Sequence, residues 1–159
     1  MVALPPSKPL VVDQNSIAEL RESLRNDRWV LEQNFLPQGK AAHLLSAHSQ
    51  LIDQYLRRVW LGLLLPDNIA LVAVGGYGRS ELYPKSDIDL LILLDAESEK
   101  LMTGHPPDDA LQHKLHELIS MLWDIGLEVG HSIRTVAECL SESADITVQT
   151  NLLDRKSVV

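Results

Sequence analysis

Two aspartates separated by one residue are the first feature of the sequence that could do chemistry. Asp87 and Asp89 open an apolar run that continues to Asp95. In a strand, two such residues share one face, with about 7 Å between their Cα atoms. Neighbouring carboxylates repel each other unless a cation lies between them, and oxygen ligands favour a hard ion such as Mg²⁺ or Mn²⁺. The pair therefore predicts a metal site; the alternative is a turn or N-cap pair without an ion.

A glycine-rich turn precedes the aspartates. Gly75, Gly76 and Gly78 follow the apolar run of residues 69–74. Glycine tolerates positive φ and allows a ligand to approach the backbone closely. If residues 79–82 open a helical turn, its free N–H groups and its dipole favour an anion in front of the glycines. We interpret the glycines as a phosphate cradle, although a tight turn without a ligand would need the same residues.

Two polar side chains beside the glycines are further candidates for phosphate binding. Ser80 could donate a hydrogen bond to a phosphate, and Arg79 could neutralise phosphate charge. A surface ion pair between Arg79 and Glu81 is an equally simple explanation. Phosphate, divalent metal and two aspartates together predict phosphoryl or nucleotidyl transfer.

Hydrophobic spacing and capping residues predict the elements that must position these side chains. Strands are expected over residues 69–74, 87–95 and 127–133. Helices are expected over 16–35, 40–64, from Asp108 or Asp109 to a stop at Gly126, over 135–141 and over 145–154. Residues 96–108 are expected to form a polar loop. Four further side chains are expected in or beside the core: Trp60, Trp123, His131 and Cys139.

Composition narrows the class of protein and its compartment. The 159 residues are 45% hydrophobic and 23% charged, as in ordinary globular domains. A formal net charge of −8 gives no electrostatic footprint for a nucleic-acid backbone. The single cysteine allows no disulfide framework, the N-terminus has no signal-peptide pattern, and no apolar run could span a bilayer. We therefore expect a cytoplasmic protein with neither nucleic-acid nor membrane partners.

The glycine turn and the aspartates also carry a family resemblance. The string GGYGRSELYPKSDIDLL at residues 75–91 resembles the signature of the nucleotidyltransferase superfamily typified by DNA polymerase beta. Within it, the string is similar to the bacterial uridylyltransferase/uridylyl-removing enzymes that modify the PII nitrogen-signalling protein, as are residues 122–139 and 145–154. That family more often has glycine where this sequence has Ser80. The resemblance implies an α/β (α+β) nucleotidyltransferase core: a short mixed sheet flanked by helices and preceded by two N-terminal helices.

The resemblance implies a specific reaction, in which a tyrosine hydroxyl of PII attacks the α-phosphorus of UTP and pyrophosphate leaves. Mg²⁺ held by Asp87 and Asp89 would orient the triphosphate. The superfamily usually adds a third carboxylate from a later strand, and Glu128 is the only acid within the third predicted strand. Glu128 could instead face solvent on an edge strand, which leaves Asp124 and Asp145 as further candidates.

The organisation of the chain suggests one structural unit with two parts. We expect residues 1–65 to form an N-terminal arm and helices that pack on a nucleotidyltransferase core of residues 66–159. Enzymes of this family are several times longer, with an HD phosphohydrolase domain and ACT domains that have no counterpart in this sequence. We therefore interpret the chain as a fragment with weak or no activity alone. Two other functions stay open: nucleotidyl transfer to a small molecule or another protein, and nucleotide binding by an incomplete site.

Overall fold

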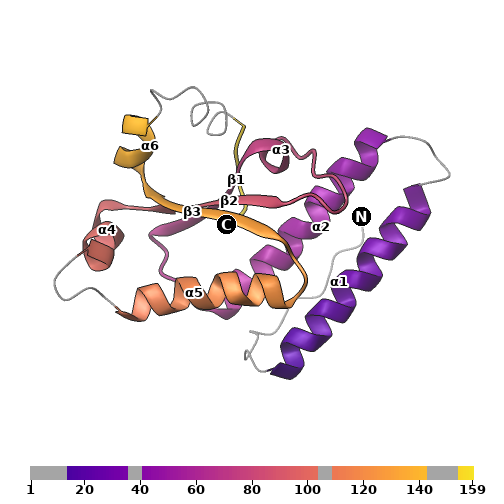
Figure 1. Cartoon of the computed structure of the whole chain (residues 1–159), viewed down its shortest axis with the longest axis horizontal. Helices are drawn as coiled ribbons and strands as arrows, with labels where there is room; N and C mark the ends of the chain where they lie inside the picture. The colour runs from indigo at the N-terminus through magenta and orange to yellow at the C-terminus, as the bar shows by residue number, and fades with distance from the viewer. Residues whose placement is uncertain (1–13, 36–40, 104–108, 143–153) are drawn as a thin grey trace.

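A four-stranded mixed sheet with the strand order β3-β2-β1-β4 forms the centre of the fold (Figure 1). The computed structural model describes residues 14–35, 41–103, 109–142 and 154–159. The strands are β1 (Ile69–Ala73), β2 (Ile88–Leu94), β3 (Val129–Thr135) and β4 (Lys156–Ser157). β2 pairs antiparallel with β1 and parallel with β3, and β4 pairs antiparallel with the other edge of β1. The three predicted strands and the mixed sheet are confirmed, and β4 is an addition.

The two central strands are largely buried on both faces, because β1 and residues 90–94 of β2 are continuous apolar runs. Their register places Leu71 opposite Ile92 in the main core, and Val72 opposite Leu91 on the other face. All four side chains are buried. β3 is an edge strand, and between its buried ends its residues are exposed or only partly buried. The strand order therefore decides which residues of the sheet contact solvent.

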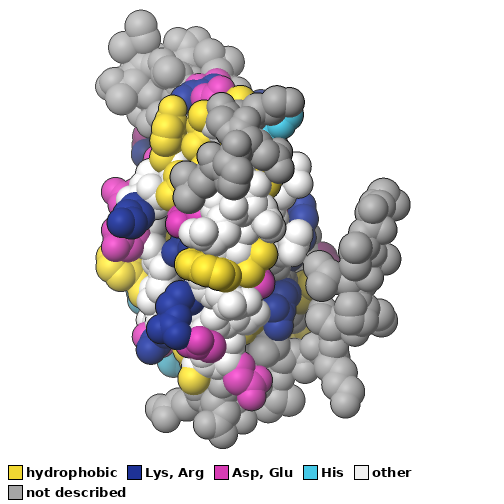
Figure 2. Space-filling model, turned by 90° about the vertical axis from the view of Figure 1, so that its right-hand side faces the viewer, with side chains coloured by type: hydrophobic (Ala, Val, Ile, Leu, Met, Phe, Trp, Pro, Cys, Tyr) yellow, Lys and Arg dark blue, Asp and Glu magenta, His cyan; other side chains and the backbone are white. Residues whose placement is uncertain are grey.

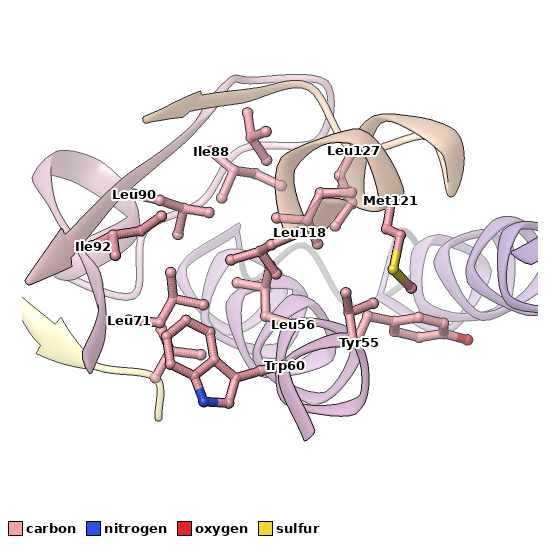
Figure 3. Packing of buried hydrophobic residues seen from close by; sticks show 14 of the residues in the cluster. Tyr55, Leu56, Trp60, Leu71, Ile88, Leu90, Ile92, Leu118, Met121 and Leu127 are labelled. Atoms are coloured by element: carbon pink, nitrogen blue, oxygen red, sulfur yellow. The ribbon is translucent and has the colours of Figure 1, made fainter. Parts of the chain in front are cut away.

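Three helices lie on one side of the sheet (Figure 1): α1 (Gln14–Phe35), α2 (Ala41–Gly62) and α5 (Asp109–Asp124). Figure 3 shows Leu56 and Trp60 of α2 and Leu118 of α5 gathered against Leu71 and Ile92 of the sheet. Burying one such side chain contributes about 1.5–3 kcal/mol relative to leaving it exposed. The apolar stripe predicted for residues 40–64 is confirmed, and it includes the expected burial of Trp60.

Local capping confirms two of the predicted helix ends. Three short helices complete the described elements: α3 (Gly75–Gly78), α4 (Ala96–Thr103) and α6 (Val136–Glu142). Gly126, at φ +88°, ends α5, and the following Leu127 N–H donates back to the Leu122 carbonyl. Thr135 and Glu138 form the capping box of α6, because each side chain accepts the other residue's backbone N–H at 2.7 and 3.1 Å.

The prediction of a polar loop over residues 96–108 is wrong where α4 forms. Asp95 is the reason: its carboxylate accepts the Ser98 N–H at 2.7 Å and the Asn68 amide at 3.1 Å. The hydrogen bond from the Ser98 backbone is the largest cause of a lowered pKa for Asp95. A carboxylate at this position satisfies the first N–H groups of the helix. Asp95 is the last residue of the predicted strand, one position before the polar stretch, so the sequence pattern does not mark it as a helix cap.

The N-terminal helices pack on the sheet, with one boundary shifted. α1 begins at Gln14 rather than at the predicted cap, Ser16. Leu20 and Leu24 of α1 belong to the same buried cluster as the strands. The division of the chain at residue 65 stays a prediction, and the helix predicted over 145–154 lies outside the described residues except for its last position.

The surface mixes charges of both signs. Figure 2 shows acidic and basic side chains interspersed on the face that lies at the right of Figure 1. On α1, Arg25 and Glu22 form an exposed ion pair of this kind. The described side chains of this face therefore form no basic stripe of the type that binds a nucleic-acid backbone. Among the described helices, none is long and apolar enough to cross a bilayer.

Candidate active site

The paired aspartates lie where β2 begins. Asp87 directly precedes the strand and Asp89 is its second residue, and both are exposed. Ile88 and Leu90, the residues that alternate with them, are buried in the core. This alternation places both carboxylates outside the core, as the spacing of the pair predicts. Their role as metal ligands stays a prediction.

The electrostatics of the pair favour a cation. Partial desolvation by the surrounding protein, and secondly the negative charge of Asp87, raise the pKa of Asp89 above its usual value. A nearby positive charge would act in the opposite direction, because it stabilises the ionised carboxylate. The donor set consists of carboxylate oxygens, which suit a hard divalent ion. The residues present therefore fit Mg²⁺ or Mn²⁺.

Gly130 of β3 leaves room for one of these carboxylates. The register of the parallel pair places Asp89 opposite Gly130. A Cβ atom at Gly130 would lie 3.1 Å from the Asp89 Oδ1 atom, which is a tight contact. A larger residue at this position would push against the carboxylate. The absence of a side chain at Gly130 therefore leaves space for the Asp89 carboxylate.

Glu128 lines the same cleft as Asp87. The cleft, of about 430 Å³, is lined by Asp87, Trp123, Gly126, Leu127, Glu128, Val129 and Gly130. The Ile88 N–H donates to the Glu128 carbonyl at 2.9 Å, so the start of β3 lies beside the start of β2. The Glu128 side chain is exposed. The strand therefore brings this acid to the end of the sheet that carries the aspartates.

The described residues do not form a complete three-carboxylate metal site. Within the described ranges, no three His, Cys, Asp or Glu side chains are close enough to hold one metal ion. Asp124 is exposed, and its carbonyl accepts a hydrogen bond from Arg21. Asp145 lies outside the described residues. The third ligand, with Glu128 as the nominee, stays a prediction.

The helical turn at the glycines begins earlier than the sequence suggested. α3 consists of the glycines and Tyr77 themselves, and Arg79 is its C-cap, so a helical turn over 79–82 is wrong. Ser80 stops the turn, because its φ of +61° lies in the left-handed region. Just before α3, the Val74 N–H donates to the Asp89 carbonyl at 3.1 Å. This hydrogen bond joins the start of the turn to the strand that carries the aspartates.

The three glycines of the turn have different reasons to be glycine. Gly75 has a φ of +60°, which favours glycine whatever surrounds it. A Cβ atom at Gly78 would lie 1.9 Å from the Asp154 carbonyl oxygen, so the backbone of the C-terminal segment excludes any side chain. A Cβ atom at Gly76 would meet nothing closer than 3.7 Å. Conformation and packing therefore explain Gly75 and Gly78 without a ligand, and they do not explain Gly76.

The fold gives Arg79 acidic partners, whereas it holds Ser80 in an unfavourable backbone conformation. A serine in the left-handed region costs of order 1–2 kcal/mol, so the glycine that the family resemblance implies at this position would be less strained. Arg79 forms ion pairs with Glu81, at 2.9 Å, and with Asp154. These hydrogen bonds raise the pKa of Arg79. The ion pair expected as the alternative is thus present, and phosphate binding by either residue stays a prediction.

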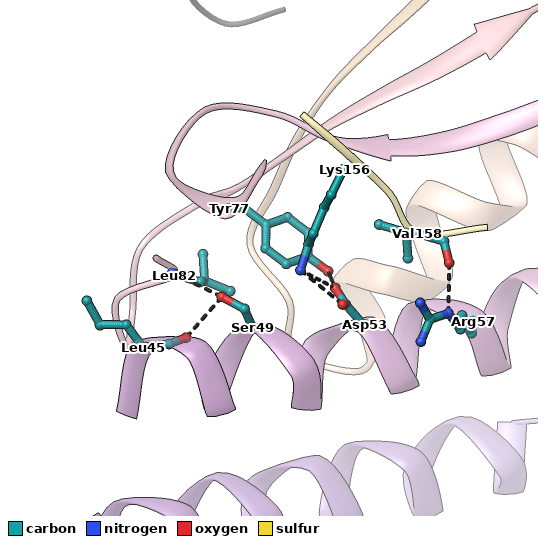
Figure 4. A network of polar contacts seen from close by, with 8 residues as sticks. All are labelled: Leu45, Ser49, Asp53, Arg57, Tyr77, Leu82, Lys156 and Val158. Carbon is teal, nitrogen blue, oxygen red and sulfur yellow. Dashed lines mark hydrogen bonds and ion pairs between the residues drawn. The ribbon is translucent and has the colours of Figure 1, made fainter. Parts of the chain in front are cut away.

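Sequence reasoning missed a group of buried polar residues on α2 that contact the glycine turn. His48, Ser49 and Asp53 interrupt the apolar stripe of the helix and are almost fully buried. Figure 4 shows Ser49 and Asp53 directed toward Leu82 and Tyr77 of the turn. The signal available in the sequence was polar side chains at core spacing on a helix otherwise rich in leucine.

Three residues expected in or beside the core lie elsewhere. Trp123 is 57% exposed and lines the cleft, because α5 turns its other face to the sheet. His131 is exposed because β3 is an edge strand. Cys139 of α6 is only partly buried. The position of β3 in the sheet decides the exposure of His131, whereas Trp123 lies on the face of α5 that points away from the core.

A comparison with protein-family models assigns the chain to a family. The model described as "Nucleotidyltransferase domain" matches residues 55–151, from α2 through the glycine turn and the aspartates to beyond β3. The chain belongs to the nucleotidyltransferase domain family, and it is a transferase domain.

Comparison with curated proteins shows which members of this family the chain resembles. The chain is 44% identical over 138 residues to the "Bifunctional uridylyltransferase/uridylyl-removing enzyme" of Nitrosospira multiformis. It is 45% identical over 142 residues to the enzyme of the same name in Thiobacillus denitrificans, and 47% identical over 128 residues to that of Burkholderia lata. These matches cover 86%, 89% and 80% of this chain, and only 15%, 16% and 14% of the relatives. The resemblance to this enzyme family is confirmed over most of the chain.

Proposed function

We propose that this domain transfers a uridylyl group from UTP to a tyrosine hydroxyl of the PII protein, with release of pyrophosphate. The name of the relatives supports the uridylyl group, and the family resemblance supports the acceptor. One observation of the structure carries the chemistry. Two exposed carboxylates, Asp87 and Asp89, begin the strand to which the glycine turn is hydrogen-bonded.

Asp87 and Asp89 are the residues that would hold the divalent cation, Mg²⁺ or Mn²⁺. The raised pKa of Asp89 and the space left by Gly130 support this assignment. Such an ion, when bound, neutralises charge on the triphosphate during transfer. The protein contributes by fixing two carboxylates at one end of the sheet, so that little reorganisation is needed when the nucleotide binds.

The glycine turn would orient the triphosphate. Gly76 presents backbone without a side chain and without a structural reason for being glycine, which suits the close approach of a phosphate. Gly75, Gly78, Arg79 and Ser80 would complete the cradle or support it. Arg79 would exchange an ion pair with Asp154 or Glu81 for a phosphate oxygen.

Glu128 would accept the proton of the attacking hydroxyl. It lines the cleft with Asp87, where an acceptor could approach. The hydroxyl oxygen forms the new bond to the α-phosphorus, the bond to the pyrophosphate oxygen breaks, and the proton passes to the carboxylate. The proposal takes UTP and PII as partners, without nucleic acid or membrane, and places the reaction in the cytoplasm.

A second function is favoured by one specific observation. The described residues contain no group of three metal-ligating side chains, so a domain with two carboxylates could bind a metal–nucleotide complex without completing transfer. Transfer to a small molecule or to another protein is the other alternative, since nothing in the cleft identifies the acceptor. Both alternatives keep the carboxylate–triphosphate site and differ only in the step after nucleotide binding.

The test is calorimetric titration with UTP and ATP, each with and without Mg²⁺. We expect Mg²⁺-dependent binding that prefers UTP and is lost in Asp87→Asn/Asp89→Asn. The double variant Asp67→Asn/Asp109→Asn is the control, because it removes the same charge from exposed positions outside the cleft. Incubation with radiolabelled UTP and PII, or PII whose acceptor tyrosine is changed to phenylalanine, then tests transfer. A folded wild-type chain that binds no nucleotide would contradict the proposal.

A further inference from the structure

We propose that the polar face of α2, formed by His48, Ser49 and Asp53, positions the glycine turn (residues 75–82) for the nucleotide by holding the turn at two points. The part of this inference that concerns nucleotide binding rests on the proposed function. These three residues are the buried polar side chains of a helix that otherwise supplies leucine, isoleucine and tryptophan to the core. Burying polar groups is unfavourable unless they are hydrogen-bonded, so their partners indicate what they do.

The first contact holds Tyr77, inside the turn. Its ring is buried, with 2% of the residue exposed. Its hydroxyl donates to the Asp53 Oδ1 atom at 2.5 Å. Burial and the neighbouring carboxylate raise the pKa of Tyr77, so the hydroxyl keeps its proton and acts as the donor. The hydrogen bond ties the backbone of α3 to α2.

Lys156 compensates the charge of Asp53. Its Nζ atom lies 2.9 Å from both Asp53 carboxylate oxygens and 4.5 Å from the centre of the Tyr77 ring (Figure 4). Lys156 belongs to β4, which pairs with β1, and the Val158 carbonyl accepts a hydrogen bond from Arg57 of α2 at 2.7 Å. Three elements that are distant in the sequence therefore meet at one carboxylate.

The second contact holds Leu82, at the far end of the turn, by both of its backbone groups. Its N–H donates to the Ser49 Oγ atom at 3.1 Å, and its carbonyl accepts a hydrogen bond from the His48 Nδ1 atom at 3.1 Å. The Ser49 hydroxyl in turn donates to the Leu45 carbonyl at 2.9 Å. No side-chain identity at residue 82 is needed for these bonds, so they act on the path of the backbone.

The backbone between the two anchors includes the unfavourable residue of the turn. Ser80, at φ +61°, lies between Tyr77 and Leu82, and the Glu81 N–H donates back to the Gly76 carbonyl at 2.9 Å. A loop that is free to change conformation loses entropy when a ligand binds and orders it. Anchors on α2 fix the loop during folding, so the binding of a triphosphate does not have to order it.

A matched pair of tyrosine variants tests the inference. Tyr77→Phe removes the hydroxyl that bonds Asp53. Tyr55→Phe is the control, because the Tyr55 hydroxyl also bonds an aspartate, Asp27, at 2.7 Å, but joins α2 to α1. Amide hydrogen exchange at residues 78–82 and the Kd for Mg²⁺–UTP are measured in both variants. We expect Tyr77→Phe to speed exchange and weaken UTP binding about tenfold, as loss of one hydrogen bond to a charged group allows. Tyr55→Phe should leave both within about twofold of wild type while lowering Tm to a similar degree.

Three further variants separate positioning from general stability. Ser49→Ala should speed exchange at the Leu82 amide, whose N–H loses its acceptor. Asp53→Asn keeps an oxygen for the Tyr77 hydroxyl, so it should protect the turn amides better than Asp53→Ala does. Equal effects of Tyr77→Phe and Tyr55→Phe on the turn would overturn the inference. So would faster exchange with an unchanged Kd. If wild type binds no UTP, the proposed function fails, and the exchange measurements still decide whether α2 holds the turn.

Discussion

Asp53 and Asp89 contact the same glycine turn, yet their surroundings are opposite. Asp53 is buried, and it binds a tyrosine hydroxyl and a lysine ammonium group within the fold. Asp89 is exposed, the charged neighbour that helps to raise its pKa is another acid, Asp87, and no cation compensates that repulsion among the described contacts. A carboxylate whose partners are all supplied by the protein stabilises the protein. A carboxylate left beside a like charge is stabilised only when something else binds, which is why we propose that Asp89, and not Asp53, binds a cation.

The largest effect should come from removing Asp53. Asp53→Ala leaves a buried tyrosine hydroxyl and a half-buried lysine without their acceptor, and breaking such a pair costs about 3–5 kcal/mol. Urea denaturation would measure this loss in the free energy of unfolding. Asp53→Asn, which keeps a hydrogen-bond acceptor, should lose clearly less. Equal losses in the two variants would mean that the negative charge, and not the hydrogen-bond acceptor that asparagine retains, matters at this position.

The aspartates of β2 should show the reverse behaviour. Asp87→Asn/Asp89→Asn should weaken Mg²⁺–UTP binding by about a hundredfold or more, roughly 2.7 kcal/mol, with no loss in the free energy of unfolding. Titration calorimetry and urea denaturation on one preparation give both numbers. A double variant that unfolds more easily than wild type would remove the contrast with Asp53.

Two glycine substitutions extend the same comparison into the turn. Gly78→Ala should destabilise the fold by about 1–3 kcal/mol, because its Cβ atom would overlap the backbone of Asp154. Gly76→Ala meets no close atom, so the stability should be unchanged or slightly higher, while UTP affinity should fall. Thermal unfolding and nucleotide titration of both variants distinguish the two roles. Loss of stability in Gly76→Ala would assign this glycine to the fold.

The smallest effect concerns pH and Asp89 without metal. Because its pKa is raised on folding, folded Asp89 holds its proton to higher pH than unfolded Asp89 does. Stability should therefore fall as pH rises from the ordinary aspartate value of 3.8 through the raised pKa, and stay lower at neutral pH. Asp89→Asn should remove this slope and stabilise the metal-free protein by under about 1 kcal/mol, given the solvent exposure. A variant less stable than wild type at pH 7 would contradict the sign.

Local signals in the sequence were enough for the strands and for the aspartates. Asp87 and Asp89 are two residues apart, so their exposure follows from strand alternation alone. Gly126 and the Thr135–Glu138 capping box act within a few residues of the helix ends that they form. Such features can be predicted because both partners of each interaction lie in one short window.

The parts that could not be predicted depend on residues far apart in the chain. Ser49 looks like an ordinary helix residue until Leu82, in a different element, is placed beside it. The burial of Asp53 is explained by its ion pair with Lys156, which lies near the C-terminal end of the sequence. The exposure of His131 depends on the strand order, because the same alternation in a central strand would have buried it.

The ion pair between Asp53 and Lys156 has a practical consequence for how far an expressed polypeptide must extend. The family match ends at residue 151, and a protein cut there would keep every described candidate residue of the site. It would nevertheless lose Lys156, and Asp53 would become a buried anion without its cation. We therefore expect a protein that ends at residue 151 to fold poorly, although it keeps every residue that the family model matches.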